Sequence, residues 1–536
     1  MKKQTYIKIG LPVILSVFSF QYSRSQEKDI DLYPTEKGKY EATWESLSEW
    51  ECPEWFKDAK FGIWAHWGPQ CQAESGDWYA RGMYFDGHWQ NEFHKKHFGD
   101  PAQYGLKELC NDWKADQWNP DSLVALYKSV GAKYFFTLGQ HHDNFDLWNS
   151  PYQEWNSVNV GPRRDIIKEW ASACEKNDLP LGISMHGSHT WTFLEIAQAY
   201  DGNLTAEDGV GKWWEGLDPQ ELYAQNHTPS PGWEIDGSIH SQWDWENCSQ
   251  PSEYFKTKFR NRVLQCIDTY NPDMIYFDDT VLPFYGCDEQ VGLDIVAHYY
   301  NHSANQQDNS TAQVVVMGKQ LKDNHKKSLL WDVERGIPND IQEKYWQTCT
   351  CIGSWHYDRG IYERGDYKDA SYVIAMLADI VSKNGNLLLS VPIRGNGTID
   401  DKEVKVLEGI RDWMNINSES IYGTRPWIVF GEGPNSETES ELKAQGFNES
   451  NNYTNKDVRY VSKDGKVYAT ILKWPDENSF LFKSLAENPG IGKVSVVKLL
   501  GAEENIDFNQ TDKGLQITIP EQRPNPIAPV FEITFD

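Results

Sequence analysis

The chain alternates short apolar, β-branched and aromatic runs with longer segments of helical periodicity, such as NPDSLVALYKSVG and DASYVIAMLADIVSKNG. The runs that resemble strands are residues 60–67, 133–139, 181–186, 274–279, 313–318, 329–334 and 386–392. Strands that are apolar over nearly their whole length and alternate with helices are typical of a parallel sheet covered on its outer face. The number of units predicts an α/β fold in which this sheet closes into a (β/α)8-like, TIM-type barrel over residues 40–420.

The pattern changes near residue 425. Short alternating runs such as RYVSKDGKVYATIL and LQITIP are separated by Asp-Gly and Pro turns and show no helical period. This pattern predicts a C-terminal antiparallel β-sandwich over residues 425–536. A polar stretch that begins at NSETESELKAQG is expected to form a long loop before the first hairpin of this second domain.

The N-terminus has the order of a secretory signal: basic residues, an apolar run from Ile9 to Phe20, and then small and polar residues. We expect residues 1–25 to be a cleavable signal peptide and the mature protein to be periplasmic or extracellular. The apolar run is shorter than the roughly 20 residues of a membrane span. No later segment is apolar enough to span a bilayer, so membrane insertion is not expected.

Composition narrows the class of partner. The formal net charge of −28 disfavours nucleic acid and anionic lipid and favours a neutral substrate. The chain contains 24 tryptophans, and flat indole rings suit the C–H faces of sugars as well as protein cores. The nine cysteines lack the spacing of a disulfide scaffold, so mostly free, buried thiols with one or two bridges are expected.

Polar residues follow several predicted strands, at the carboxyl edge where barrel enzymes carry their active sites. Histidines, carboxylates and tryptophans at one rim are typical of a sugar pocket, in which two carboxyl groups carry out the chemistry. The residues at these strand ends are His66, Trp67, Glu74, Asp77, Trp78, His141, His142, His186, Asp278, Asp279, Asp332 and Glu334.

The same histidines also allow a metal-dependent hydrolase. However, adjacent histidines at the end of an extended strand tend to point apart, and the chain has neither an HxH pair nor HExxH spacing. We therefore expect no metal and no organic cofactor.

Five fragments in chain order, WFKDAKFGIWAHWGP, GAKYFFTLGQHHDNFDLW, RRDIIKEWASACEKNDLPLGISMH, PDMIYFDD and DIVSKNGNLLLSVPIRGNGTI, resemble the α-L-fucosidases of glycoside hydrolase family 29. The resemblance runs from about Trp55 to Trp413, and the trailing β-domain matches the family's usual C-terminal domain. It implies a retaining exo-glycosidase that hydrolyses terminal α-L-fucose from a glycan or oligosaccharide.

The resemblance also implies roles for individual residues. The nucleophile is the aspartate after the aromatic position of the strand MIYF, which is Asp278; Asp279 stands where the family usually has glycine. His66, His141 and His142 are expected to bind sugar hydroxyls, with Trp78 beside them. His186 follows another barrel strand and is expected to join this substrate-binding group.

The general acid/base is less constrained. Glu334, in DVERGIP, lies at a strand end before YWQTC, where relatives carry a similar segment, and is the first choice; Glu74, Asp332 and Glu363 are competitors. Arg335 would offer Glu334 an ion pair that keeps its carboxylate charged. Trp355 and His356 are expected to line the pocket.

Two alternatives keep the fold and change the function. Gln140, Asp77 and Asp279 depart from the family pattern, which leaves open an α-galactosidase or another exo-glycosidase. A carbohydrate-binding protein without turnover is the other alternative, although the presence of Asp278 argues against it. The sequence indicates no particular oligomeric state.

Overall fold

The computed structural model describes residues 30–201, 204–224, 227–230, 248–306, 311–437, 442, 446–449, 452–503 and 505–536. The predicted signal peptide, residues 1–25, lies outside the described residues. Within these residues no helix has the length and apolar character needed to cross a membrane.

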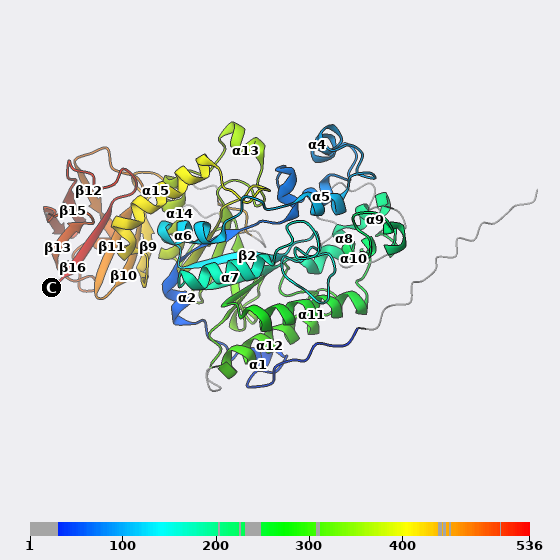
Figure 1. The fold of residues 1–536 in the computed structure, drawn as a ribbon. Coiled ribbons are helices and arrows are strands. Elements are labelled where there is room, and N and C mark those ends of the chain that lie inside the picture. The colour runs from blue at the N-terminus through cyan, green and yellow to red at the C-terminus, as the bar shows by residue number, and fades with distance from the viewer. Residues whose placement is uncertain are drawn as a thin grey trace, which may run out of the picture.

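A closed barrel of eight parallel strands, with neighbours in chain order, forms the larger part of the chain (Figure 1). This confirms the predicted barrel. Its strands are β1 Phe61–Ala65, β2 Tyr134–Gln140, β3 Leu181–Met185, β4 Met274–Phe277, β5 Val315–Gly318, β6 Leu330–Glu334, β7 Trp346–Cys351 and β8 Gly385–Ser390.

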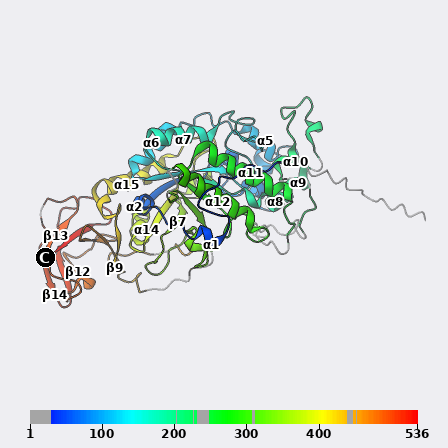
Figure 2. The same ribbon diagram turned by 90° about the horizontal axis from the view of Figure 1, so that it is seen from below.

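Helices surround the barrel and cover its strands on the outside (Figures 1 and 2). The longer ones are α4 Trp89–His97, α6 Pro120–Val130, α7 Ile166–Lys176, α11 Glu253–Tyr270, α12 Glu289–Gln306, α14 Ala370–Ser382 and α15 Asp401–Asn417. The shorter ones are α1 Trp44–Leu47, α2 Glu54–Ala59, α3 Tyr79–Gly82, α5 Leu106–Asp112, α8 Thr190–Phe193, α9 Glu195–Asp201, α10 Pro219–Leu222 and α13 Arg359–Arg364.

Local sequence signals set the ends of these helices. The side chain of Asn119 accepts a hydrogen bond from the Ser122 amide at the start of α6, Pro120 occupies the first turn, and Gly131 ends the helix at φ 109°. Asparagine at the cap satisfies an N–H group that the helix leaves unpaired, and glycine adopts a positive φ without strain. The sequence Asn119-Pro120 at one end and Gly131 at the other thus sets the bounds of α6.

Aromatic side chains fill the barrel interior. The ring of Tyr134 lies directly over Gly62 of the neighbouring strand, and that of Phe136 lies over Gly182. A Cβ at either glycine would come within 2.5 Å of the ring above it. Glycine at these two positions thus makes room for large rings in the core.

The C-terminal part contains two antiparallel sheets, as predicted, with strand orders β13-β16-β11-β10-β9 and β12-β15-β14. A separate apolar core lies between these strands. They are β9 Arg425–Glu432, β10 Val458–Lys463, β11 Lys466–Ile471, β12 Ser479–Phe482, β13 Val494–Leu499, β14 Phe508–Thr511, β15 Gly514–Thr518 and β16 Val530–Phe535.

The nine cysteines, all of them among the described residues, form no disulfide bond, and most of them are buried. The expectation of one or two disulfide bridges is therefore wrong for this structure. Cys349 and Cys351 alternate with Thr350 on β7 and so share a face of that strand.

A buried ion pair joins the two domains. Arg459 on β10 pairs with Asp379 on α14, and both side chains are only 1% exposed. Lys383 also contacts Asp379, at 3.0 Å. Burial alone would raise the pKa of Asp379, but the two cations lower it to about 2.

We expect Arg459→Met to lower the free energy of unfolding by about 3 kcal/mol, because it removes the main partner of a buried carboxylate. The native pKa of Asp379 lies below its ordinary value, so its contribution to stability is present above about pH 4 and is lost as the pH falls toward 2. Urea unfolding at pH 7 and pH 3 measures both effects. Arg425→Met is the matched control, because Arg425 forms exposed pairs with Glu54 and Asp58; its expected cost is below about 1 kcal/mol. An equal loss in both variants would contradict this account.

Candidate active site

A pocket opens at the carboxyl ends of the barrel strands. Residues from both sheet ends and loops line it, and aromatic rings alternate with charged and imidazole groups. They are Trp64, His66, Asp77, Trp78, His141, His186, Tyr276, Asp278, Lys319, Glu334, Trp355, His356 and Phe447. Every substrate-binding residue predicted from the sequence belongs to this set except His142, whose ring contacts Asp278 behind it.

Asp278 follows β4 directly and is held by three side chains. One carboxylate oxygen faces His142 Nε2 at 3.2 Å and His186 Nδ1 at 3.1 Å, and the other accepts a hydrogen bond from Lys319 Nζ. Burial alone would raise the pKa of Asp278, but Lys319 and His186 hold it well below the ordinary value. The carboxylate therefore stays charged near neutral pH in a fixed orientation, as a nucleophile requires.

The neighbouring Asp279 points elsewhere. Its carboxylate accepts a hydrogen bond from Ser188 Oγ at 2.6 Å and lies 2.7 Å from His189 Nε2. It is 3% exposed and does not line the pocket. Of the two adjacent aspartates, only Asp278 is placed to reach a ligand in the pocket.

Glu334 is the last residue of β6. The ammonium group of Lys319 lies between its carboxylate and that of Asp278. Lys319 Nζ donates to Glu334 Oε2 at 2.6 Å and also contacts Asp278. Burial would lower the pKa of Lys319, but the two carboxylates raise it well above the ordinary value. Arg335, which the sequence offered as the partner of Glu334, pairs instead with Glu449 at 2.7 Å.

The competing carboxylates lie outside the pocket. Asp332 is buried one layer deeper, where Gln347 Nε2 and Cys349 Sγ donate to it, and burial raises its pKa to about 6. Glu74 pairs with Arg359, and Glu363 is exposed on α13. Glu334 is thus the one candidate acid/base among these four that faces Asp278.

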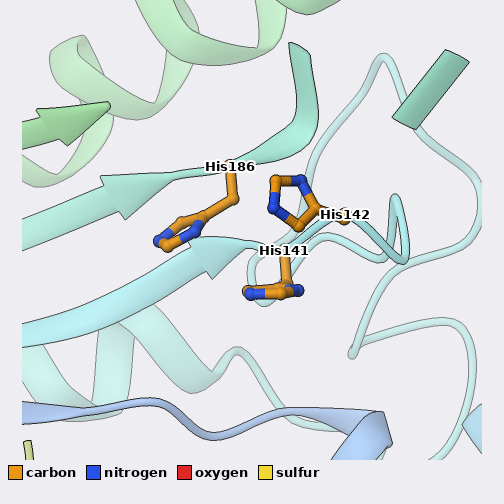
Figure 3. Close-up of side chains that lie close together, drawn as sticks. All are labelled: His141, His142 and His186. Carbon is orange, nitrogen blue, oxygen red and sulfur yellow. The ribbon is translucent and has the colours of Figure 1, made fainter. Parts of the chain in front are cut away.

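The adjacent histidines lie closer together than the sequence led us to expect. The rings of His141 and His142 are 4.6 Å apart between centroids, and the His186 ring is 4.7 Å from that of His141 (Figure 3). The prediction that the pair points apart is wrong, because β2 ends at Gln140 and its register shifts between Leu138 and Gln140. Each ring offers a nitrogen within 4.8 Å of the others, which is a spacing that a metal ion can bridge.

His66, His141 and His142 are neutral at pH 7. Burial lowers the pKa of His66 and His141 well below the ordinary value, with further lowering by neighbouring histidines, and lowers that of His142 to about 4. A carboxylate only accepts hydrogen bonds, so the nitrogens of His142 and His186 that face Asp278 carry the protons. In the pocket, the rings of His66 and His141 are therefore neutral donors and acceptors for hydroxyl groups.

Gln70 fixes the tautomer of His141. The backbone N–H of Ala80 donates to Gln70 Oε1 at 3.2 Å, which turns the amide nitrogen toward His141 Nδ1 at 2.8 Å. Since an amide nitrogen only donates, Nδ1 accepts and the proton of the neutral ring is on Nε2. Nothing in the sequence pattern pointed to Gln70, because its role depends on a contact over 71 positions.

Aromatic rings form the wall beside His66. Trp355 lies 4.9 Å from the His66 ring between centroids, and Trp78 adopts a left-handed backbone conformation at φ 60°. Asp77 accepts hydrogen bonds from the backbone N–H of His356 at 2.6 Å and of Trp355 at 3.3 Å. The segment that carries Trp355 and His356 is thereby fixed to the loop after β1.

The family model described as alpha-L-fucosidase matches residues 31–419, and the model described as alpha-L-fucosidase C-terminal domain matches residues 450–534. The chain belongs to the α-L-fucosidase family. Because it belongs to this family, it is a glycoside hydrolase. The barrel and the C-terminal domain each match one of the two family models.

Named relatives agree with this family in both sequence and fold. The tissue alpha-L-fucosidase of Bos taurus is 26% identical over 518 residues, covering 93% of this chain and 91% of that protein. The Thermotoga maritima alpha-fucosidase in complex with a mechanism-based inhibitor has a TM-score of 0.69 at 23% identity; the match covers 92% of this chain and 100% of that chain. A GH29 alpha-L-fucosidase of Bacteroides thetaiotaomicron, a trapped covalent intermediate, has a TM-score of 0.56 at 17% identity, covering 94% and 99%.

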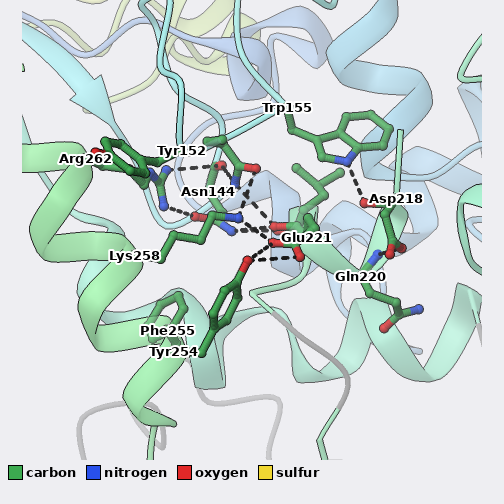
Figure 4. Close-up of polar contacts among 12 residues, drawn as sticks. Asn144, Tyr152, Trp155, Asp218, Gln220, Glu221, Tyr254, Phe255, Lys258 and Arg262 are labelled. Atoms are coloured by element: carbon green, nitrogen blue, oxygen red, sulfur yellow. Dashed lines mark hydrogen bonds and ion pairs between the residues drawn. The ribbon is translucent and has the colours of Figure 1, made fainter. Parts of the chain in front are cut away.

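In this member of the family, the loop after the histidine pair is held from behind by α10 and α11 (Figure 4). Arg262 donates to Asn144 Oδ1 at 2.7 Å and pairs with the buried Asp146. Asn144 Nδ2 in turn donates to the carbonyl of Glu221 at 3.0 Å, and Lys258 pairs with the Glu221 carboxylate. These buried contacts fix the backbone that carries His141 and His142.

Proposed function

We propose that this protein is an exported, retaining exo-α-L-fucosidase that removes terminal α-L-fucose from neutral glycans by double displacement. Family membership supports the activity, and the pocket described above supports the mechanism. A small pocket lined by aromatic rings and imidazoles suits one terminal sugar residue. The N-terminal 25 residues, with the order of a signal peptide, support export.

The observation that carries the mechanism is the spacing of two carboxylates. Asp278 and Glu334 both contact Lys319 Nζ, so their nearest oxygens lie within about 6 Å, twice the length of a hydrogen bond. Retaining glycosidases hold their two carboxyl groups about 5–5.5 Å apart, whereas inverting enzymes need about 6.5–9.5 Å to admit a water molecule. The arrangement favours attack by Asp278 itself.

The reaction follows from these positions. The Asp278 carboxylate attacks the anomeric carbon while Glu334, protonated in the reactive complex, gives its proton to the departing glycosidic oxygen. A covalent fucosyl ester on Asp278 results. Glu334 then takes a proton from water, which attacks the same carbon, releases fucose with retained configuration and restores Asp278.

The remaining pocket residues bind the sugar. His66, His141 and His186 line the pocket and offer ring nitrogens to its hydroxyls, whereas His142 holds Asp278 from behind. His141 offers Nε2–H because Gln70 occupies its other nitrogen. Trp78 and Trp355 offer flat faces to the apolar side of the ring, including its methyl group. No metal takes part in this scheme.

Release of nitrophenol from aryl α-L-fucoside and aryl α-D-galactoside, with and without a chelator, tests the proposal. We expect turnover of the fucoside that the chelator leaves unchanged. Turnover of the galactoside alone would reassign the sugar, and loss of activity on chelation would revive a metal-dependent mechanism. A lack of turnover with both glycosides and with fucosylated oligosaccharides would favour a binding protein.

We expect Lys319→Met to lower kcat/KM by about 10–100-fold and to move the acidic limb of its pH profile upward by more than one unit. Lys319 helps to hold the pKa of Asp278 below its ordinary value, so its removal raises that pKa and leaves less nucleophile ionised at pH 4–5. Lys319→Arg keeps the charge and should retain the wild-type limb. An acidic limb that stays in place in the methionine variant would contradict this role.

A further inference from the structure

A short segment of the C-terminal part returns to the active site. Gly446 pairs with Glu334 in a parallel bridge, and the backbone N–H of Phe447 donates to the Glu334 carbonyl at 2.9 Å. The N–H of Glu449 donates to the Arg335 carbonyl at 3.1 Å. Residues 446–449 therefore lie beside the end of β6, next to the acid/base.

Side chains anchor this segment firmly. The Glu449 carboxylate, 8% exposed, accepts hydrogen bonds from Arg335 Nε at 2.7 Å and Thr350 Oγ1 at 2.5 Å, and Lys368 Nζ lies 3.2 Å away. Asn448 Oδ1 accepts from the Ile337 amide at 2.9 Å. Charge-assisted hydrogen bonds of this kind fix geometry as well as adding stability.

The Phe447 side chain differs from its anchored neighbours because it is 48% exposed. Its backbone has φ 59°, a left-handed conformation that is rare for a bulky side chain. The anchors on both sides hold it there, and backbone strain of this kind concentrates at functional positions. An exposed aromatic ring is thus held in a strained conformation at the mouth of the pocket.

Phe447 also lies between the pocket and a neighbouring groove and lines both of them. It lines the pocket with Asp278 and Glu334, and it lines an adjoining groove with Arg335, Tyr367 and Asp369. Phe447 is the residue that the pocket and the groove share, so a molecule bound in the pocket can continue past the ring into the groove. Its charged and hydroxyl groups suit a saccharide chain.

We propose that Phe447 is the platform on which the first sugar of the leaving group stacks, and that the groove beyond it receives the rest of a fucosylated oligosaccharide. This inference rests on the proposed function. The acid/base must lie beside the departing oxygen. Phe447 is hydrogen-bonded through its own backbone N–H to the carbonyl of Glu334, so its ring lies close to the place where the leaving sugar begins. The C–H face of the leaving sugar then covers the exposed ring, while its hydroxyls face Arg335 and Asp369.

Kinetics on two substrates that share the fucosyl group test the proposal. Fucosyl fluoride has no sugar in its leaving group, whereas fucosyl-lactose does. We expect Phe447→Ala to lower kcat/KM for fucosyl-lactose about tenfold more than for the fluoride, a ratio equivalent to about 1.4 kcal/mol. Phe447→Trp keeps a flat ring and should restore the wild-type ratio, and Phe447→Leu, which is apolar without a ring, should not.

Transfer from the intermediate gives a second readout. When lactose replaces water, its hydroxyl attacks the fucosyl carbon, the ester bond to Asp278 breaks, and the hydroxyl proton passes to Glu334. With fucosyl fluoride as donor, Phe447→Ala should lower the ratio of transfer to hydrolysis by about tenfold. This ratio does not depend on how much folded enzyme is present.

Leu481→Ala is the matched control, since Leu481 is an apolar residue of the C-terminal domain that is 37% exposed and lies outside the pocket. It should leave both ratios unchanged. Equal losses on the two substrates in Phe447→Ala would overturn the platform and assign the segment to the positioning of Glu334. Unchanged ratios would also overturn it. Failure of the wild type to consume fucosyl fluoride would instead refute the proposed function.

Discussion

Asp278→Ala is expected to lower kcat for aryl α-L-fucoside by about 10⁴-fold or more, because it removes the group that forms the covalent bond. The fold should persist, since the change leaves the buried apolar strand β4 intact. Steady-state hydrolysis at pH 6–7 measures the loss. Sodium azide should restore part of the turnover, because a small anion fits the space that the carboxylate leaves and attacks the same carbon. The rescued product should be fucosyl azide of inverted configuration.

The adjacent aspartate provides the control. Asp279 binds Ser188 and His189 outside the pocket, so Asp279→Asn should retain at least about a hundredfold more activity than Asp278→Ala. Azide should give no fucosyl azide with it. If Asp279→Asn were the inactive variant and azide rescued it, the nucleophile would be misassigned.

Glu334→Gln should have the second-largest effect, and its size should depend on the leaving group. Without a proton donor, kcat/KM for fucosyl-lactose should fall by about 10²–10⁴-fold, whereas fucosyl fluoride, which departs without protonation, should lose far less. The basic limb of the pH profile for fucosyl-lactose should disappear, because the group that must carry the proton is gone. Parallel kinetics on the two substrates measure the difference.

Glu363→Gln serves as the matched control for this variant, because Glu363 is an exposed carboxyl on α13 that the sequence also offered as an acid/base. It should behave as the wild type on both substrates. Equal losses on fucosyl-lactose and on the fluoride in Glu334→Gln would contradict an acid/base role and indicate a role in binding.

The barrel could be predicted because most of its strands are continuously apolar, but β7 shows where this signal weakens. Its sequence WQTCTC contains polar residues that are buried in the structure. Gln347 donates a hydrogen bond to Asp332 and accepts one from Tyr134 inside the barrel. A buried polar network satisfies these groups. Hydrophobic periodicity alone does not distinguish such a strand from a loop.

The carboxylates and histidines of the site could be placed because parallel strands bring their carboxyl ends together. The role of Lys319 could not be predicted, because a lysine after a strand is usually solvated. In the structure its charge is balanced by Asp278, 41 positions earlier in the chain, and by Glu334, 15 positions later. The position of Phe447 at the pocket could not be predicted for a similar reason. The contact between Asn448 and Ile337 that fixes its segment joins residues 111 positions apart. Pairings over such distances are set by tertiary packing.

The orientation of the histidine pair shows a third limit. An alternating pattern would send His141 and His142 to opposite faces. The register shift in β2 and the contacts of Asn144 and Arg262 behind the loop bring the two rings next to each other. Local periodicity fails where the strand ends and tertiary contacts set the direction of the side chains.

The most direct test of the mechanism is mass spectrometry of the enzyme after incubation with 2-deoxy-2-fluoro-fucosyl fluoride, which forms the fucosyl ester but slows its hydrolysis. We predict that the intact protein gains the mass of one fluorofucosyl group and that peptide mapping places it on Asp278. An adduct on another residue, or no adduct with an enzyme that hydrolyses aryl α-L-fucoside, would contradict double displacement through Asp278.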